Sequence, residues 1–254
     1  MSRKKTRFAS DSRTTVIADN FPWIFAAVIG LPAVALIVWS ELARPANDSA
    51  APVARVVTDG SEKRYVPFLA RLVETHPRAE IRMTFAELLK TARVAVNFED
   101  SNDGVALATL VTEEVPGRGR MAVLNVSPRA LTDVSLSDTR KQMVLWHEYQ
   151  HYLQLAEGRA PWESFRIRAP GSVPTSDELV VVFRAEVEAY IAETALGKEL
   201  GETAWPPFCV ELYRGNVAAF EHTLAAEMAR WPMFRSHKEL LEQLASRPYQ
   251  RLEK

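Results

Sequence analysis

The sequence predicts an α+β domain that follows a single transmembrane helix. Three observations lead to this expectation: an uncharged apolar run at residues 21–40, three short β-branched segments between about residues 93 and 127, and several longer stretches with helical spacing. The chain has 254 residues, of which 47% are hydrophobic and 25% charged. That length and composition suit one globular domain of about 200 residues with accessory segments.

Residues 21–40 have the properties of a membrane-spanning helix. The segment FPWIFAAVIGLPAVALIVWS contains no charged residue, and a helix of this length spans the roughly 30 Å hydrocarbon layer of a bilayer. A cleaved signal peptide, the alternative, has a shorter apolar region of about 7 to 15 residues. Residues 1–20 carry five basic and two acidic residues, a net charge of +3. The positive-inside rule therefore predicts a cytoplasmic N-terminus, a retained signal anchor and an extracytoplasmic C-terminal domain.

The remaining boundaries follow from composition. After the basic tail (1–20) and the anchor (21–40), residues 41–60 are rich in Ala and Pro and are expected to form a linker, and residues 61–254 form the folded domain. The net charge of −1 argues against a nucleic-acid partner, because no basic excess is present to neutralise phosphates. Cys209 is the single cysteine, which excludes an internal disulfide, and we expect it to be buried.

The β-branched segments predict a small, mostly antiparallel sheet. The three expected strands are VAVNFE, VALATLVT and RMAVLNVS, and EEVPGRG forms the turn before the last of them. A helix is expected from residue 61, and a short one at 84–93, where Thr84 and Glu87 have the spacing of a capping box.

Four further helical stretches follow the expected sheet. The first, at 139–158, is predicted to be capped by Ser137 or Asp138 and ended by Gly158. The next, at 176–197, is predicted to be capped by Ser176 or Asp177 and ended by Gly197. The last two are expected at about 207–230 and 236–246.

The first of these helices carries the sequence HEYQH. His147 and His151 are four residues apart, so on a helix both imidazoles lie on one face and can bind one zinc ion. Glu148 points in a neighbouring direction, where its carboxylate can reach a water molecule as a general base. The surrounding turns are apolar, which predicts a buried or cleft environment rather than a solvated face. His76 and His237, by contrast, are expected to be solvated.

A catalytic zinc site normally has three protein ligands, and the third must come from elsewhere in the chain. The HEYQH motif, followed by RAEVEAY on the next helix, resembles the gluzincin branch of the zincin metallopeptidases. In that family a glutamate on a later helix completes the site, and in some membrane-associated members it opens an E-x-x-A-D pattern. The resemblance covers about residues 93–197 and implies a zincin-like metallopeptidase domain, with the sheet packed on the HExxH helix and the glutamate helix.

Carried over to this chain, the resemblance implies that Glu186 is the third zinc ligand, 35 residues after His151. Ala189 matches the small residue of the pattern, and Tyr190 stands where the family has aspartate. A tyrosine hydroxyl there could bond a ligand histidine or line the substrate cleft. Glu188 is the main alternative to Glu186 as the third ligand, and two weaker alternatives are Glu178 and Glu193.

The expected function is therefore a membrane-anchored, zinc-dependent metallopeptidase that binds one zinc ion and hydrolyses polypeptide substrates. The strand RMAVLNV is expected to border the cleft and hold the substrate extended. Tyr190, Tyr213 and His222 are the candidates for stabilising the oxyanion. Two other functions stay open: a catalytically inactive zincin-like binding or regulatory module, and a non-peptidase metal hydrolase acting on cell-wall material.

Overall fold

The computed structural model describes residues 62–99, 107–115, 117–166, 173–203, 205–230 and 234–247. The expected cytoplasmic tail, the apolar segment 21–40 and the linker therefore lie outside the described residues. Among the helices of the described ranges, none combines the length and the apolar character needed to cross a bilayer.

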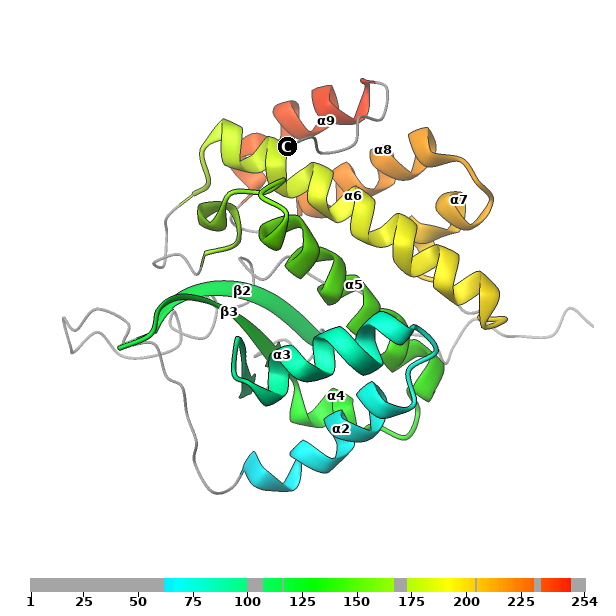
Figure 1. Ribbon diagram of the computed structural model, residues 1–254. Coiled ribbons are helices and arrows are strands. Elements are labelled where there is room, and N and C mark those ends of the chain that lie inside the picture. The colour runs from blue at the N-terminus through cyan, green and yellow to red at the C-terminus, as the bar shows by residue number, and fades with distance from the viewer. Residues whose placement is uncertain are drawn as a thin grey trace, which may run out of the picture.

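Three strands form a small mixed sheet (Figure 1). They are β1 (Val94–Phe98), β2 (Ala108–Val115) and β3 (Gly119–Val126), in the order β1-β3-β2. The central strand β3 is antiparallel to β2 and parallel to β1. The α+β class and the three strands are thus confirmed, whereas an antiparallel arrangement holds for only one of the two pairings. Gly117 and Gly119 both have positive φ in the turn between β2 and β3, as the Gly-rich segment predicts.

Helices pack on the sheet and extend away from it (Figure 1). The longer ones are α5 (Asp138–Ala156) and α6 (Ser176–Glu199), which lie side by side, with α5 also contacting β2. The other elements are the 3₁₀ turns Glu62–Arg64, Trp162–Phe165, Pro207–Cys209 and Arg235–His237, the π-helical turn η2 (Ile81–Phe85), and the helices α2 (Val66–Glu74), α3 (Ala86–Lys90), α4 (Pro128–Thr132), α7 (Val210–Tyr213), α8 (Val217–Met228) and α9 (Lys238–Ala245).

Two hydrophobic clusters meet along the α5–α6 pair. One combines a face of the sheet with α2, η2, α3, α4 and α5, and includes Leu110, Leu124 and Phe85. The other joins α6 to α7, α8 and α9 and includes Phe220, Leu241 and the buried Cys209. Burial of apolar surface on both sides holds α5 and α6 in place, because each helix is bound to its own cluster as well as to the other helix.

The start and the end of α5 follow the sequence prediction. The Ser137 hydroxyl accepts a hydrogen bond from the Arg140 N–H at 3.0 Å, which satisfies a free donor of the first turn. Gly158, with φ of 68°, follows the last turn and allows the chain to leave the helix.

The helix α6 begins at Ser176, as predicted, but its predicted N-cap and its predicted end are wrong. Its N-cap is Thr175, which forms a capping box with Glu178, rather than Ser176 or Asp177. The helix continues through Gly197 and ends before Gly201, whose φ is 73°. Gly197 serves another purpose: a Cβ there would lie 2.4 Å from the Trp205 ring and 2.6 Å from the Met143 methyl carbon. The missing side chain thus lets α5 and Trp205 pack closely against α6.

Two other helix predictions need correction. Thr84 lies inside the π-helical turn η2, which runs directly into α3, so the expected capping box with Glu87 does not form. The stretch 207–230 is interrupted at Gly215, whose φ is 85°, and is therefore divided into α7 and α8. The helix from residue 61 corresponds to α2, and the last predicted helix to α9.

His76 is fully buried, contrary to the expectation that it is solvated. Its Nδ1 accepts a hydrogen bond from the Arg78 N–H at 3.1 Å, so the proton resides on Nε2, which donates to the Gln142 carbonyl at 2.9 Å. The second of these bonds ties the turn after α2 to α5. Burial, together with the nearby Arg82 and Arg78, lowers the pKa of His76. His237 is half-buried.

The close approach at Gly197 leads to a first prediction. A Gly→Ala change in a helix with free space stabilises a protein by about 0.5 to 1 kcal/mol. We expect Gly197→Ala to do the opposite and lower the free energy of unfolding by about 1 to 3 kcal/mol, because its methyl group overpacks the contact with Met143 and Trp205. Urea unfolding of the two proteins measures the difference, and a stabilised variant would contradict the close packing.

A second prediction concerns His76 and acid stability. The pKa of His76 is lowered in the folded state, so below about pH 6.5 the imidazole is protonated in the unfolded chain before it is protonated in the folded chain. The contribution of His76 to the free energy of unfolding is therefore complete above that pH and is lost on acidification. Relative to His76→Gln, the wild type should lose stability in urea unfolding between about pH 7.5 and 5.5. His222→Gln, which removes an exposed imidazole of α8, is the control. A stability difference between wild type and His76→Gln that stays constant with pH would refute the assignment.

Candidate metal centre

The predicted ligand residues meet where α5 faces α6. His147 and His151 lie one turn apart on α5, and Glu186 lies on α6. All three side chains are buried, with exposed fractions of 1%, 3% and 0%. The structure therefore brings together the two histidines of HEYQH and the glutamate that the sequence assigns as the third ligand.

The distances within this triad suit a small tetrahedral ion. The two Nε2 atoms are 3.1 Å apart. The Glu186 oxygens lie 3.4 Å from Nε2 of His147 and 3.3 Å from Nε2 of His151. Two ligand atoms at tetrahedral positions, each with the 2.0 to 2.1 Å bond typical of zinc, are about 3.3 Å apart. The three side chains therefore already have the spacing that binding one shared zinc ion would require.

The Glu186 carboxylate is unusual because neither of its buried oxygens has a hydrogen-bond partner among the residues that the structure describes. A buried carboxylate without hydrogen bonds is costly, by several kcal/mol, unless a positive charge compensates it. Both oxygens approach the imidazoles in a geometry that makes no proper hydrogen bond. A cation held between the three side chains would satisfy these oxygens and the facing imidazole nitrogens together.

Each imidazole is held by a hydrogen bond on its outer nitrogen. Nδ1 of His147 contacts Oε2 of Glu193 at 3.0 Å, and Nδ1 of His151 contacts Oε1 of Gln154 at 2.9 Å. Both acceptors require an N–H on Nδ1, which leaves the Nε2 lone pairs directed toward Glu186. Gln154 in turn donates to the Ala185 carbonyl at 3.1 Å. Such outer contacts orient histidine ligands in metal sites.

Tyr190, which stands where the family has aspartate, contacts His147 through its ring. The two ring centroids are 4.5 Å apart in an edge-on arrangement, and the tyrosine ring also packs against Phe208 and Phe220. The hydrogen bond to Nδ1 of His147 comes from Glu193, three residues further along α6. A carboxylate thus contacts Nδ1 of His147 from position 193, while the residue at 190 packs in the core.

Glu148 lies beside the triad but points toward the sheet. Its carboxylate accepts a hydrogen bond from the backbone N–H of Leu110 in β2, at 2.7 Å, and its side chain is buried. Burial raises the pKa of Glu148 to about 7, although His147 and His151 act in the opposite direction. A carboxylate with such a pKa can both accept and release a proton near neutral pH.

The charges around the triad favour a cation. Burial alone would lower the pKa of His147, but Glu186 and Glu193 outweigh it and raise that pKa to about 10. Burial would likewise raise the pKa of Glu186, but His151 and His147 lower it to about 2. Three carboxylates in this small volume therefore stabilise positive charge at the point where the imidazole nitrogens meet.

Two of the three alternative ligands are engaged elsewhere, and the third, Glu193, contacts Nδ1 of His147 from the outer side. Glu188 forms an ion pair with Arg159 at 2.6 Å, and Glu178 accepts the Thr175 N–H at 2.7 Å in the capping box. Of the other candidates for the oxyanion, Tyr213 is 41% exposed beside Trp205, and His222 is exposed on α8. Neither belongs to the buried cluster.

The strand next to the site is β2, not the predicted RMAVLNV strand β3. β3 is flanked by β1 on one side and by β2 on the other, so neither of its edges is free to pair with a substrate. In an antiparallel pair the backbone groups of alternate residues point outward, and the Leu110 N–H, bonded to Glu148, is one of these on β2. Further along β2, Thr112 bridges to Arg166, and its hydroxyl donates to the Trp162 carbonyl at 2.7 Å.

Sequence reasoning missed Gln154 and Arg140, and it considered Glu193 only as a weaker alternative for the third ligand. Arg140, Glu193 and Gln154 act through other side chains and belong to no short motif. Helical periodicity was the available signal: Gln154 follows His151 by three residues, Arg140 precedes His147 by seven, and Glu193 follows Glu186 by seven. All three therefore lie on the same helix faces as the ligands.

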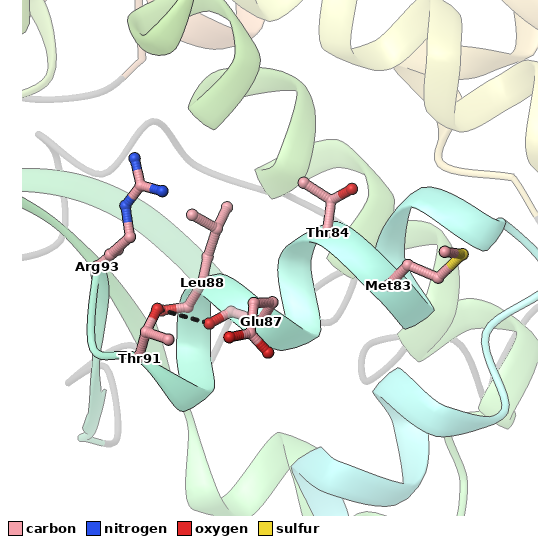
Figure 2. Close-up of a pocket in the computed structure, with 6 residues that line it drawn as sticks. All are labelled: Met83, Thr84, Glu87, Leu88, Thr91 and Arg93. Atoms are coloured by element: carbon pink, nitrogen blue, oxygen red, sulfur yellow. Dashed lines mark hydrogen bonds between the residues drawn. The ribbon is translucent and has the colours of Figure 1, made fainter.

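A separate hollow lies on the outer side of η2 and α3 (Figure 2). Its lining is mixed in polarity and contains none of the triad: Met83, Thr84, Glu87, Leu88, Thr91 and Arg93. The Thr91 hydroxyl donates to the Glu87 carbonyl at 2.7 Å. The hollow therefore contributes nothing to the candidate metal centre.

Comparisons with models of protein families, with curated proteins and with solved structures found no match to this chain. The resemblance to gluzincins thus rests on the HEYQH motif and on the glutamate of the following helix.

A third prediction tests the ligand set. Glu186→Ala should reduce the bound metal from about one zinc ion per chain to a small fraction, because two imidazoles alone do not complete the site. Glu188→Ala, the control on the same helix, should retain the ion, since Glu188 pairs with Arg159. Elemental analysis of the purified full chain after dialysis measures both. Retention by the first variant and loss by the second would transfer the ligand role to Glu188.

Proposed function

We propose that this chain is a zinc-dependent metallopeptidase. The observation that carries the proposal is the convergence of His147, His151 and Glu186, with the oxygens of Glu186 buried and not hydrogen-bonded to any residue in the described part of the chain. Two imidazole nitrogens and one carboxylate are a ligand set that suits zinc. Zinc bound there would supply Lewis-acid chemistry, activating a water molecule and polarising a carbonyl group.

Glu148 is the proposed general base. It follows His147 directly on α5, so its carboxylate lies beside the triad without belonging to it. Its pKa of about 7 suits it to take a proton from the attacking water and to deliver a proton to the leaving amine. To act, the carboxylate must exchange its hydrogen bond with the Leu110 N–H for one with the water.

The proposed substrate is a polypeptide that pairs with the outer edge of β2 at Leu110, on the N-terminal side of the bridge between Thr112 and Arg166. An extended peptide can add to a strand whose outward N–H and C=O groups are free. The Leu110 N–H lies at that edge, immediately beside Glu148. Once Glu148 turns to the water, this N–H becomes available to a substrate carbonyl next to the bond to be cleaved.

The proposed location outside the cytoplasm rests on the sequence. The apolar segment 21–40 and the basic tail before it support a signal anchor, which would hold the domain close to the membrane surface. Substrates near the membrane would then be favoured by the high local concentration that a tether of about 20 residues provides.

A zincin-like binding module without proteolytic activity is the second candidate. The observation that favours it is the burial of the site, since Glu148 is 2% exposed and its carboxylate is already bonded to β2. Such a module would need the metal for structure but would not need access for a substrate.

A fourth prediction separates the two candidates. Glu148→Gln should keep its zinc, because Glu148 is not a ligand, and should lose at least about 100-fold of the cleavage rate, because the amide cannot accept a proton. The measurement compares the full-length proteins in detergent on a peptide library, after the zinc content of each has been determined. Equal cleavage by both proteins would exclude Glu148 as the base, and absence of cleavage by either would favour the binding module.

A further inference from the structure

A buried ion pair crosses from α5 to α6 immediately behind His147. Glu193 of α6 contacts Nδ1 of His147 through Oε2 at 3.0 Å and Nη2 of Arg140 through Oε1 at 3.2 Å. The side chains of Arg140 and Glu193 are only 7% and 4% exposed. One carboxylate therefore links a buried cation to a proposed metal ligand.

We propose that Glu193 and Arg140 act as a positioning pair that sets the metal affinity of this site through His147. The inference rests on the proposed metal site and deepens it. Glu193 performs the role for which the gluzincin pattern uses an aspartate at position 190, and Arg140 is an addition that this pattern does not contain.

The contact with Glu193 determines which nitrogen of His147 faces the metal. A carboxylate only accepts hydrogen bonds, so Nδ1 must carry a proton, and Nε2 is the nitrogen left to present a lone pair to a metal. The Tyr190 ring packs edge-on against the imidazole, 4.5 Å between centroids, and limits rotation of its plane. Glu193 thus fixes the tautomer, and the Tyr190 ring packs against the imidazole.

Arg140 compensates the charge of the third carboxylate in this cluster, that of Glu193. Glu148, Glu186 and Glu193 are all buried near the two imidazoles, and an uncompensated buried carboxylate is costly. Arg140 precedes His147 by two helical turns on α5, so its guanidinium lies on the face that meets Glu193. With Arg140 present, Glu193 remains a charged acceptor without adding net negative charge to the cluster.

The proposal is tested on zinc affinity, which does not require a substrate. Glu193→Gln keeps the size of the side chain but weakens the acceptor and leaves the Arg140 cation buried beside the site. We expect the zinc dissociation constant to rise about 10- to 100-fold. Adding Arg140→Met to this variant should recover part of the loss, because the uncompensated cation is removed. Tyr190→Phe should leave the constant nearly unchanged.

The dissociation constants are measured on the full-length proteins in detergent by competition with a chromogenic chelator. The absorption spectrum of the cobalt-substituted proteins provides a second readout, and we expect it to change in Glu193→Gln, because the orientation of His147 changes. Glu221→Gln is the matched control: Glu221 is also fully buried and paired with a buried arginine, Arg184, but it lies between α6 and α8. Glu221→Gln should change the free energy of unfolding of the zinc-free protein, measured in urea. It should leave the zinc affinity and the cobalt spectrum unchanged.

The outcomes distinguish this inference from the proposed function. If the wild type binds no zinc, the metallopeptidase proposal fails, and the positioning pair fails with it. If the wild type binds zinc and Glu193→Gln binds it equally well, only the positioning pair is refuted. A larger loss in Tyr190→Phe than in Glu193→Gln would return the positioning role to residue 190.

Discussion

The structure depends on the close contact between α5 and α6. Along this contact α5 presents Arg140, His147 and His151, which meet Glu193 and Glu186 of α6. Gly197 allows the approach at one end, because Met143 lies where a side chain at that position would be. A shift of one helix along the other would separate the imidazoles from Glu186 and Arg140 from Glu193 at once. The geometry of the site and the packing of α5 against α6 therefore depend on each other, because neither can change without the other.

This constraint is energetically demanding. Two imidazoles, three carboxylates and a guanidinium are buried where an ordinary helix pair would bury apolar side chains. Replacing buried ion pairs by apolar residues is often neutral or stabilising, so fold stability does not explain the cluster. The two hydrophobic clusters on either side compensate the cost of burying these polar groups. They hold α5 against the sheet and α6 against α7, α8 and α9. The apolar parts of the domain thus keep a polar centre in a fixed geometry.

The sequence predicted local features well and features of spatial pairing poorly. HEYQH identifies its own helix face, and the cap at Ser137 and the stop at Gly158 are set by neighbours in the chain, so all were predicted correctly. Sheet order and the buried state of His76 depend on contacts between distant segments, such as the bond from His76 to the Gln142 carbonyl. Gly197 was misinterpreted for the same reason. A glycine near the end of a helical pattern suggests a stop, and only the positions of Met143 and Trp205 reveal its packing role.

The position of Glu193 illustrates why a motif is a weaker guide than the geometry it encodes. A residue of α6 that contacts His147 must lie on the same face of the helix as Glu186, and both the fourth and the seventh residues after Glu186 meet that condition. At position 190 the ring of Tyr190 completes the core with Phe208 and Phe220, which leaves the support of His147 to another residue. Glutamate is one methylene longer than aspartate and reaches Nδ1 from one turn further along the helix. The requirement is an acceptor behind the imidazole, and the helix offers more than one residue from which to supply it.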